Sequence, residues 1–406
     1  MDYRELAALT KRDSYTLATL PEAARNDALA AVAAALEEHR EEIFAANEAD
    51  LAAADALPAP IAARLKFDEH KLNDCVRGIH DLIALPDPLF RTLMRRELDE
   101  GLVLSRTTCP IGVIGVIFES RPDALVQIST LCIKSGNGAI LKGGSEARHT
   151  NKALFETIAA AARGAGLPEH FAFQVEDRTA IDELLQCEES IDLIIPRGSN
   201  AFVQYILTHS RIPVMGHADG ICHVYVDRSA DLDKAVPIIV DAKTQYAAAC
   251  NAMETLLVQE DVADDLVERV RQASPVDIEV RDGEDREFLD YIMTVRRVAD
   301  VGEAIDFINR NGSHHTDCIV TEDAANAELF MDRVDSAGVY WNCSTRFADG
   351  YRYGFGAEVG ISTGKLHARG PVGLDGLVTY KYRLKGDGHI VADYASGRRS
   401  FHFRDL

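Results

Sequence analysis

The feature that most constrains the fold is an alternation of β-branched runs with helix-forming stretches, which begins near Leu102. The run VLSRTTCPIGVIGVIF is typical of strands, DALVQISTLCIKSG of a helix and AILKGG of a further strand. This order continues through FAFQV, TAIDELLQCE and IDLIIP, and a second series starts at HVYVD. Strands that alternate with helices favour parallel sheets with helical crossovers. The sequence therefore predicts an α/β fold with two parallel-sheet domains.

The two ends of the chain show different patterns. The first eighty residues are rich in Ala, Glu, Leu and Arg at helical spacing, which predicts helices. The tail GLVTYKYRLKGDGHIVAD alternates apolar and polar residues on either side of Gly386 and Gly388, which predicts a hairpin or edge strands. A length of 406 residues exceeds one ordinary core, so we expect two or three domains.

The charge excludes two classes of partner. The chain has 65 Asp and Glu against 43 Lys and Arg, which gives a formal charge of −22 that repels nucleic acid and anionic membranes. We expect neither as a partner. Because 32 of the 43 cations are Arg, the composition also suggests a hypothesis, an acidic surface adapted to a cytosol of high salt.

Compartment and metal content follow from the N-terminus and the cysteines. The start MDYRELAALTKRD has no signal-peptide pattern, and the eight cysteines are scattered without a C-x-x-C pair, so we expect reduced thiols in the cytoplasm. His314, His315 and Cys318 are close in sequence, but no second ligand cluster accompanies them. We therefore expect no metal site.

Two glycine-containing segments are candidates for binding an anionic ligand, although the standard dinucleotide fingerprint is absent. In LKGGSEA, Lys142 ends a predicted strand, Gly143 and Gly144 allow a tight turn, and Ser145 can open the next helix. In IIPRGSNAF, the set Arg197, Gly198 and Ser199 stands between a strand and a helix N-terminus, where backbone N–H groups favour anions. A surface lysine beside a turn explains the first segment equally well, and an ordinary strand-to-helix turn explains the second.

Cys250 has the most suggestive setting of the cysteines. In TQYAAACNAMETLLVQ it lies among small residues between a predicted helix and a predicted strand, which leaves room for a substrate. Inert packing remains the alternative, because most cysteines are buried and unreactive.

Several long runs resemble a known family. PIGVIGVIFESRPDALVQISTLCIKSGNGAILKGGSEA, IPVMGHADGICHVYVD, DAKTQYAAACNAMETLLV and STRFADGYRYGFGAEVGISTGKLHARGPVGLDGL are similar to segments of gamma-glutamyl phosphate reductases. These enzymes form the proline-pathway branch of the aldehyde dehydrogenase superfamily, and the resemblance covers nearly the whole chain. It implies an NADP-dependent oxidoreductase with an aldehyde dehydrogenase-like fold.

The resemblance assigns roles to individual residues. Cys250 falls at the place of the superfamily's thiolate nucleophile, Arg121 near that of a side-chain oxyanion donor, and the backbone of Asn251 or of Cys250 itself could supply a second donor. Lys142 matches a lysine that contacts the adenosine side of the cofactor. Ser145 stands where NAD-preferring relatives often have an acid, which favours NADP, although Glu146 is only one residue further on. The remaining implied contacts are Glu287 to the nicotinamide ribose and a candidate substrate set of Asn342, Thr345, Arg346, His367 and Arg369.

The implied reaction is reduction of L-glutamyl 5-phosphate to L-glutamate 5-semialdehyde by NADPH, with loss of phosphate, through a thioester on Cys250. This is the second step of proline biosynthesis from glutamate. Gly216 stands where ordinary aldehyde dehydrogenases carry the glutamate that activates water, which disfavours hydrolysis of the thioester. The alternatives are a hydrolytic NAD(P)-dependent semialdehyde dehydrogenase and a non-catalytic partner that channels the acyl phosphate from its kinase.

The resemblance also implies an organisation. We expect residues 1–97 and 110–225 to form a cofactor-binding domain, 226–370 a catalytic domain, and 98–109 with 371–406 an oligomerisation hairpin and tail. Exposed edge strands in that last unit would pair across subunits, so we expect a homodimer or homotetramer. The substrate would come from a separate glutamate 5-kinase.

Overall fold

The computed structural model describes residues 2–54, 64–119, 121–177 and 180–406. The chain divides into two compact units. The first comprises Met1–Gly198, Ile206–Val214 and Gly373–Leu406, and the second comprises Ser199–Tyr205 and Met215–Val372. Our expected boundary at residue 225 differs from this division, because the strand Cys222–Val226 pairs with later strands and so belongs to the second unit.

The N-terminal part of the first unit is helical, as the spacing of its apolar residues predicts. Asp2 and Asp68 cap two of its helices by accepting hydrogen bonds from the backbone N–H groups of Arg4 and Lys71. The helices bury an apolar face that includes Leu29, Val32 and Ile79. They are α1 (Tyr3–Leu17), α2 (Glu22–Glu38), α3 (Arg40–Ala52) and α5 (Glu69–Ala84).

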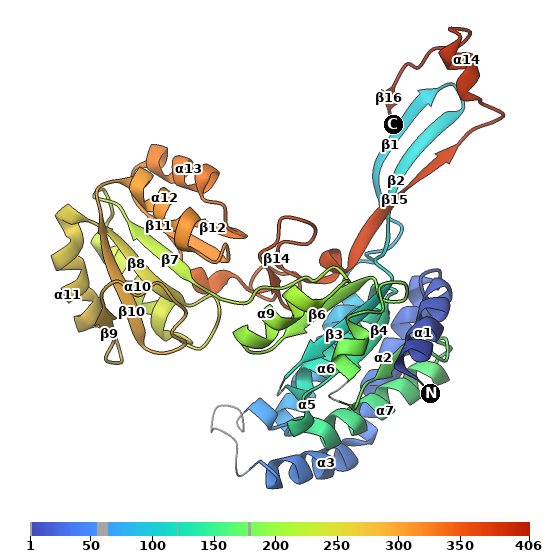
Figure 1. Cartoon of the computed structure of the whole chain (residues 1–406), viewed down its shortest axis with the longest axis horizontal. Coiled ribbons are helices and arrows are strands. Elements are labelled where there is room, and N and C mark those ends of the chain that lie inside the picture. Colours follow the sequence, from blue (N-terminus) through green and yellow to red (C-terminus); the bar gives the residue numbers. More distant parts are fainter. Residues whose placement is uncertain (1, 55–63, 120, 178–179) are drawn as a thin grey trace. The chain divides into compact units, whose positions relative to one another are not determined.

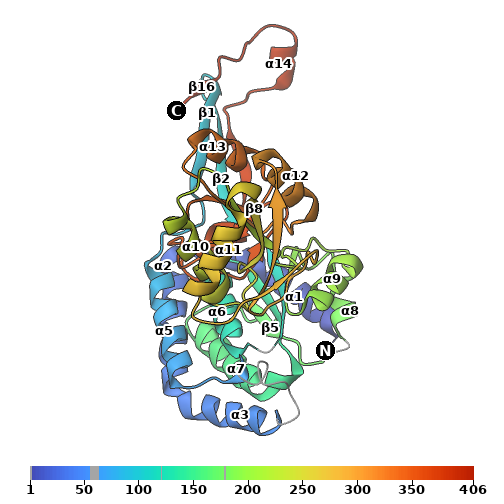
Figure 2. The same ribbon diagram turned by 90° about the vertical axis from the view of Figure 1, so that its left-hand side faces the viewer.

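A four-stranded parallel sheet follows in the same unit, in the order β5-β4-β3-β6. The strands β3 and β4 are buried along their whole length, as expected for a sheet covered on both faces. Helices α2, α3 and α5 pack against the crossover helices α6 and α7 (Figures 1 and 2). The elements are β3 (Val113–Phe118), α6 (Pro122–Lys134), β4 (Gly138–Lys142), η1 (Ser145–Ala147), α7 (Arg148–Gly164), β5 (Ala172–Gln174), α8 (Ala180–Leu184) and β6 (Leu193–Arg197).

The second unit is built on a six-stranded parallel sheet in the order β12-β11-β7-β8-β10-β9. Its central strands are fully buried between helices, and α10 and α11 lie on the same core cluster as Val224, Leu256 and Val258. The strands are β7 (Cys222–Val226), β8 (Met253–Gln259), β9 (Glu279–Arg281), β10 (Ile292–Val298), β11 (Thr316–Val320) and β12 (Gly338–Trp341).

The other elements from α9 to β14 complete this part of the chain: α9 (Asn200–His209), α10 (Leu232–Thr244), η2 (Glu260–Val262), α11 (Ala263–Ala273), α12 (Val301–Asn311), α13 (Ala324–Arg333), η3 (Thr345–Phe347) and the antiparallel pair β13 (Ile361–Ser362) and β14 (Gly370–Pro371). Helix α9 spans the division between the two units. The predicted α/β class with two parallel sheets is confirmed.

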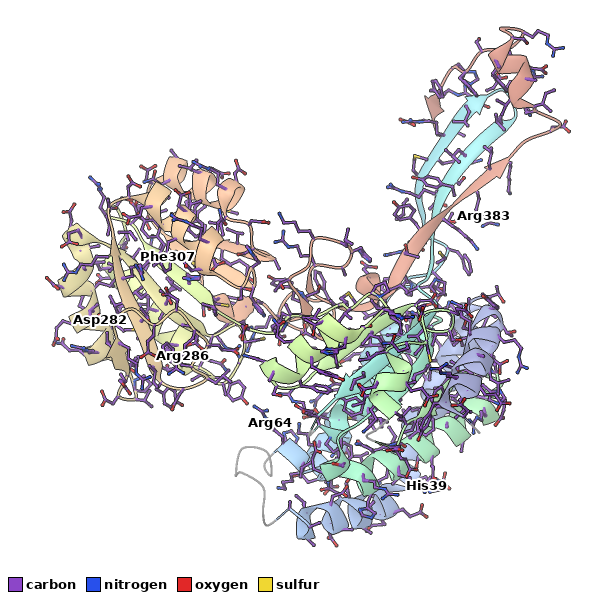
Figure 3. The ribbon with its side chains drawn as sticks, in the orientation of Figure 1. His39, Arg64, Asp282, Arg286, Phe307 and Arg383 are labelled. Atoms are coloured by element: carbon purple, nitrogen blue, oxygen red, sulfur yellow. The ribbon has the colours of Figure 1, made fainter. Side chains whose placement is uncertain are left out.

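A small antiparallel sheet in the order β15-β2-β1-β16 joins residues from near position 100 to the tail. It comprises β1 (Thr92–Asp99), β2 (Leu102–Pro110), β15 (Val378–Lys385) and β16 (Arg404–Asp405), with η4 (Leu374–Leu377) before β15 and α14 (Val391–Ala395) after it. The tail is therefore not a hairpin, because the run after Gly388 forms α14. The prediction of an edge strand holds for β15, whose side chains are largely exposed, as Arg383 is in Figure 3.

Two further observations bear on the expected compartment and chemistry. Among the described residues, no helix is long and apolar enough to cross a lipid bilayer. All eight cysteines are free thiols rather than disulfides.

Candidate active site

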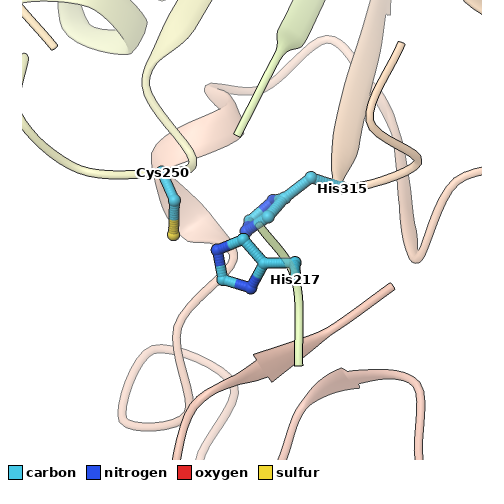
Figure 4. A group of neighbouring side chains, drawn as sticks. All are labelled: His217, Cys250 and His315. Atoms are coloured by element: carbon cyan, nitrogen blue, oxygen red, sulfur yellow. The ribbon is translucent and has the colours of Figure 1, made fainter. Parts of the chain in front are cut away.

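Cys250 lies at one edge of the second unit's sheet, in a turn directly before β8. His217 precedes β7 and His315 immediately precedes β11. Because these strands are parallel, their amino ends meet at the same edge, and the three side chains come together there. Figure 4 shows the sulfur of Cys250 beside the imidazole of His217, with His315 next to it.

The distances confine these side chains to a small volume. The sulfur of Cys250 and one ring nitrogen from each histidine all lie within 4.8 Å of one another. The two imidazole rings meet edge to face, with centroids 4.8 Å apart and an interplanar angle of 78°. Cys250 is partly exposed, whereas His315 is completely buried. Sequence reasoning missed His217 and His315 as members of the site, because nothing local links them to Cys250.

Glycine at position 220 makes this arrangement possible. A Cβ atom on Gly220 would lie 2.0 Å from the backbone oxygen of Cys250 and 2.5 Å from its Cα atom. The segment that carries His217 therefore packs directly on the backbone of the candidate nucleophile. In the sequence, the only sign of this contact is the glycine in HADGICH, and the local pattern does not explain why a glycine is needed there.

Asn251, Thr345 and Arg346 lie in the same neighbourhood. The Asn251 side chain donates a hydrogen bond of 2.8 Å to the backbone oxygen of Ala348, which ties the η3 segment to the residue after Cys250. Oδ1 of Asn251 and Oγ1 of Thr345 are both buried without a hydrogen-bond partner in the described structure. Such groups are costly unless a ligand or water satisfies them, so both suit substrate contacts.

Arg346 is a buried cation that interacts electrostatically with Cys250. Its Nε donates a 2.9 Å hydrogen bond to Gln245, and its guanidinium lies over the ring of Tyr246. Desolvation lowers the pKa of Arg346, with further lowering by the positive charge of Arg352. A buried guanidinium beside the thiol fits an anionic substrate group.

The structure does not bring Asn342 to Cys250. Asn342 follows β12 at the carboxyl edge of the sheet, the opposite edge from Cys250, and its φ of 53° turns the chain back. Its side chain accepts from Thr321 N at 3.0 Å and donates to Thr321 O at 3.0 Å. Asparagine suits this turn because it tolerates the left-handed conformation that the turn requires. Its position at the opposite edge corrects the expectation that Asn342 contacts the substrate.

His367 and Arg369 follow β13 in the second unit. His367 is exposed. Arg369 donates to the backbone oxygen and to Oδ1 of Asp335, both at 3.0 Å, and Lys365 binds the same carboxylate. Arg369 is therefore part of an ion pair with Asp335 in this structure.

Glu287 lies near the His217 segment, held by a hydrogen bond from Asn200 that the sequence did not suggest. Asn200, the first residue of α9, donates to Glu287 at 2.9 Å and to Asp219 at 2.5 Å. Desolvation raises the pKa of Glu287, although the hydrogen bonds from Asn200 and from the backbone of Gly220 act against this. Carboxylates therefore lie close to the His217 segment, even though Gly216 offers none.

The LKGGSEA segment has the predicted form, in the first unit. Lys142 ends β4, and Ser145 opens the short helix η1. Lys142 is almost fully buried and donates to the backbone oxygen of Gly143 at 2.5 Å. A Cβ atom on Gly143 would lie 2.2 Å from Nδ2 of Asn151, so this glycine is required by packing.

The remaining candidates lie at or after the ends of strands. Arg197 ends β6, and Gly198 and Ser199 connect it to α9. Arg121 occupies the N-cap position of α6 after β3. Arg121, Lys142 and Arg197 thus belong to the first unit, whereas Cys250 belongs to the second.

Comparisons with known proteins define the class. Residues 1–288 match the model of the aldehyde dehydrogenase family, and the chain belongs to this family. The acetylating aldehyde dehydrogenase of Geobacillus thermoglucosidasius shares the fold, with a TM-score of 0.68 at 17% identity over 95% of this chain and 97% of that one.

The most informative relatives share one name. The gamma-glutamyl phosphate reductase of Pelotomaculum thermopropionicum is 55% identical over 100% of this chain and 98% of the relative, and that of Acetivibrio thermocellus is 53% identical over 99% and 97%. The crystal structure of the Thermotoga maritima gamma-glutamyl phosphate reductase superposes with a TM-score of 0.92 at 36% identity, covering 95% of this chain and 99% of that one. The family resemblance and the oxidoreductase class predicted from the sequence motifs are confirmed.

Proposed function

We propose that this chain reduces L-glutamyl 5-phosphate to L-glutamate 5-semialdehyde with NADPH and releases phosphate, which is the second step of proline biosynthesis. Relatives of this name that match the chain from end to end support the substrate class. The observation that carries the mechanism is the position of Cys250, a partly exposed thiol beside a buried guanidinium and two imidazoles.

Cys250 is the best-placed nucleophile of the second unit. Burial raises the pKa of Cys222, Cys318 and Cys343, which disfavours the reactive thiolate at those positions. In the proposed reaction the Cys250 thiolate attacks the γ-acyl carbon, the C–O bond to phosphate breaks, and a thioester forms. Arg346 would hold an anionic group of the substrate, and the backbone N–H of Asn251, or that of Cys250 itself, would stabilise the developing oxyanion.

The described residues fit a phosphorylated dinucleotide. Lys142 supplies a positive charge at the end of β4. Asn151 Oδ1, which is buried beside Gly143 without a hydrogen-bond partner in the described structure, can accept from a hydroxyl group. We propose Lys142, Gly143, Ser145, Arg197, Gly198, Ser199 and Glu287 as the residues that bind it. When bound, NADPH supplies the hydride that reduces the acyl carbon.

The preference for NADP over NAD rests on Ser145, which carries no charge to repel a 2′-phosphate. Glu146 weakens this preference, because its carboxylate puts a negative charge in the same turn. Its Oε1 would lie only 2.0 Å from a Cβ atom on Gly144. The ratio of kcat/KM for NADPH and NADH measures the outcome.

The roles of the parts are also proposed. The first unit's parallel sheet would bind the cofactor, the second unit would carry the chemistry, and the sheet β15-β2-β1-β16 would join subunits into a homodimer or homotetramer. A separate glutamate 5-kinase would supply the acyl phosphate, whose lability makes synthesis close to its consumer advantageous. The free thiols support a reducing, cytoplasmic location.

The proposed reaction can be tested directly by assaying it in the reverse direction. With glutamate 5-semialdehyde and NADP, we expect NADPH to form only when phosphate is present, since phosphate must release the acyl group from Cys250. Turnover that is independent of phosphate would instead support the hydrolytic semialdehyde dehydrogenase, with Glu287 or Asp219 near the site as its base.

Substitution of the nucleophile separates catalysis from channelling. Cys250→Ala is expected to lower turnover by at least about a thousandfold, because no covalent intermediate can form. Cys343→Ala is the matched control, since Cys343 is also a partly exposed thiol of the second unit. Full activity of Cys250→Ala would overturn the proposed nucleophile.

A further inference from the structure

The cluster of Cys250, His217 and His315 offers the donor atoms of a zinc site. It is the single group of metal-ligating side chains found among the residues that the structure describes. One thiol and two imidazoles are ligands that Zn²⁺ prefers over oxygen donors, whereas Mg²⁺ and Ca²⁺ prefer oxygen. Tetrahedral zinc places neighbouring ligand atoms about 3.5 Å apart, so atoms already within 4.8 Å need only small side-chain rotations.

His315 provides an independent indication of a ligand. Its ring is completely buried, and Nε2 has no hydrogen-bond partner in the described structure. The other ring nitrogen, Nδ1, lies 3.0 Å from Oγ1 of Thr316. An unsatisfied buried nitrogen costs free energy, which a metal ion bound at Nε2 would offset.

His217 is oriented as a metal ligand as well. Its Nδ1 lies 2.8 Å from the backbone oxygen of Ile361, and a carbonyl can only accept, so Nδ1 must donate. The remaining nitrogen, Nε2, then carries the lone pair that a metal needs. A backbone carbonyl that fixes the tautomer of a histidine is the usual support of a ligand in zinc sites.

We propose that Zn²⁺ binds to Cys250, His217 and His315 and inhibits the enzyme by occupying its thiolate. Binding replaces the thiol proton, which passes to solvent, with an S–Zn bond, and no electron transfer is involved. Water fills the fourth position, on the exposed side of Cys250. This inference rests on the proposed function only for its inhibitory effect, because the site itself needs no turnover.

Direct binding is tested with Co²⁺ as a spectroscopic probe on the metal-free, full-length protein. We expect one equivalent of Co²⁺ to produce a thiolate-to-cobalt absorption band, which Zn²⁺ abolishes by displacement. Cys250→Ala should remove the band and Cys343→Ala should retain it. A band that persists in Cys250→Ala, or no band in the unmodified protein, would overturn the site.

The two histidines are tested by protection of the thiol. Zn²⁺ should slow alkylation of Cys250 by iodoacetamide, read by peptide mass spectrometry, and a chelator should restore the rate. His217→Ala and His315→Ala should each raise the Zn²⁺ concentration for half-protection by about 100-fold or more. His217 is only partly buried, so its variant remains informative if His315→Ala fails to fold. Unchanged protection in His217→Ala would overturn the proposal.

The outcomes distinguish this inference from the proposed function. If Cys250→Ala abolishes phosphate-dependent turnover but Co²⁺ and Zn²⁺ do not bind, the reductase stands and the zinc site is wrong. If the metals bind as expected and Cys250→Ala remains active, the site stands and its inhibitory role is wrong. With both correct, micromolar Zn²⁺ inhibits turnover and excess chelator reverses the inhibition.

Discussion

At the scale of the residue, the candidate nucleophile depends on a glycine that makes no chemical contact with a substrate. Gly220 lies against the backbone of Cys250 so closely that any side chain must displace one of the two segments. The family resemblance found Cys250 in the sequence, but the need for glycine at position 220 arises from a contact between separate segments.

Gly220→Ala should therefore misplace Cys250. We expect kcat/KM to fall by about 10- to 100-fold, the loss typical of a shift near 1 Å in a reacting group. Stability should fall by about 1–3 kcal/mol because of overpacking. Gly164→Ala is the control, since a Cβ atom there meets nothing within 4 Å, and it should leave both quantities unimpaired. Equal kinetics for the two variants would contradict the assigned role of Gly220.

The second unit contains a fully buried ion pair. Lys243 on α10 donates to Glu254 on β8 at 2.6 Å, and both side chains are fully buried. Lys243→Met should destabilise the protein by about 3–5 kcal/mol in urea unfolding, because it leaves a carboxyl group buried alone. The double variant Lys243→Met with Glu254→Gln should recover most of this loss, and a double variant as unstable as the single one would contradict the pairing.

The same pair predicts a dependence of stability on pH. Desolvation raises the pKa of Glu254 from 4.5 to about 7, although Lys243 acts against it. The folded state therefore holds this proton more tightly than the unfolded state does. The stability contributed by the Glu254 proton is fully present below pH 4.5 and is lost as the pH rises through about 7. Unfolding curves across this range should decline less in the double variant, and parallel curves would contradict the shift.

At the scale of the element, helices and strands could be predicted where their pattern is local. The tail shows that a local pattern does not predict how strands pair. The alternation in VTYKYRLK identifies β15 correctly. The run that follows was expected to pair with it, yet it forms α14, and the end of the chain pairs with β1 instead. Which strand pairs with which is a non-local choice that alternation does not encode.

The prediction of an oligomer rests on strand β15. Tyr380, Tyr382 and Leu384 share one face of this edge strand and are each about half exposed, at 49%, 58% and 57%. Apolar side chains on an edge strand favour pairing with another chain. The double variant Tyr382→Asp with Leu384→Asp should shift the protein towards monomer in analytical ultracentrifugation. Lys381→Ser on the opposite face should not, and an unchanged mass in the double variant would exclude this interface.

At the scale of the whole molecule, the charge of −22 is the dominant property. The composition suggests that the acidic surplus forms a surface adapted to a cytosol of high salt. Lys142 is a buried cation of the first unit and Arg346 a buried cation of the second, whereas Glu287 and Asp219 place carboxylates near the His217 segment.

Salt should therefore stabilise the fold. At molar KCl the screening length falls to about 3 Å, which suppresses repulsion among the surplus carboxylates. We expect the melting temperature to rise from dilute buffer to molar KCl, and turnover to rise with it. A non-ionic osmolyte at equal osmolality serves as the control for effects other than screening. A melting temperature indifferent to KCl would exclude adaptation to high salt.

The sequence by itself determined the N-terminal helices, the strands of the first unit's parallel sheet, the strands β7, β8, β11 and β12 of the second unit, the family and the candidate for the nucleophile. These depend on local periodicity and on long fixed motifs. Only the tertiary structure decided what surrounds Cys250. His217 and His315 reach it because β7, β8 and β11 are parallel neighbours whose amino ends share one edge. That register depends on contacts between distant segments. For the same reason the sequence could not show that Asn342, a polar candidate for substrate binding like the others, lies at the opposite edge of the sheet.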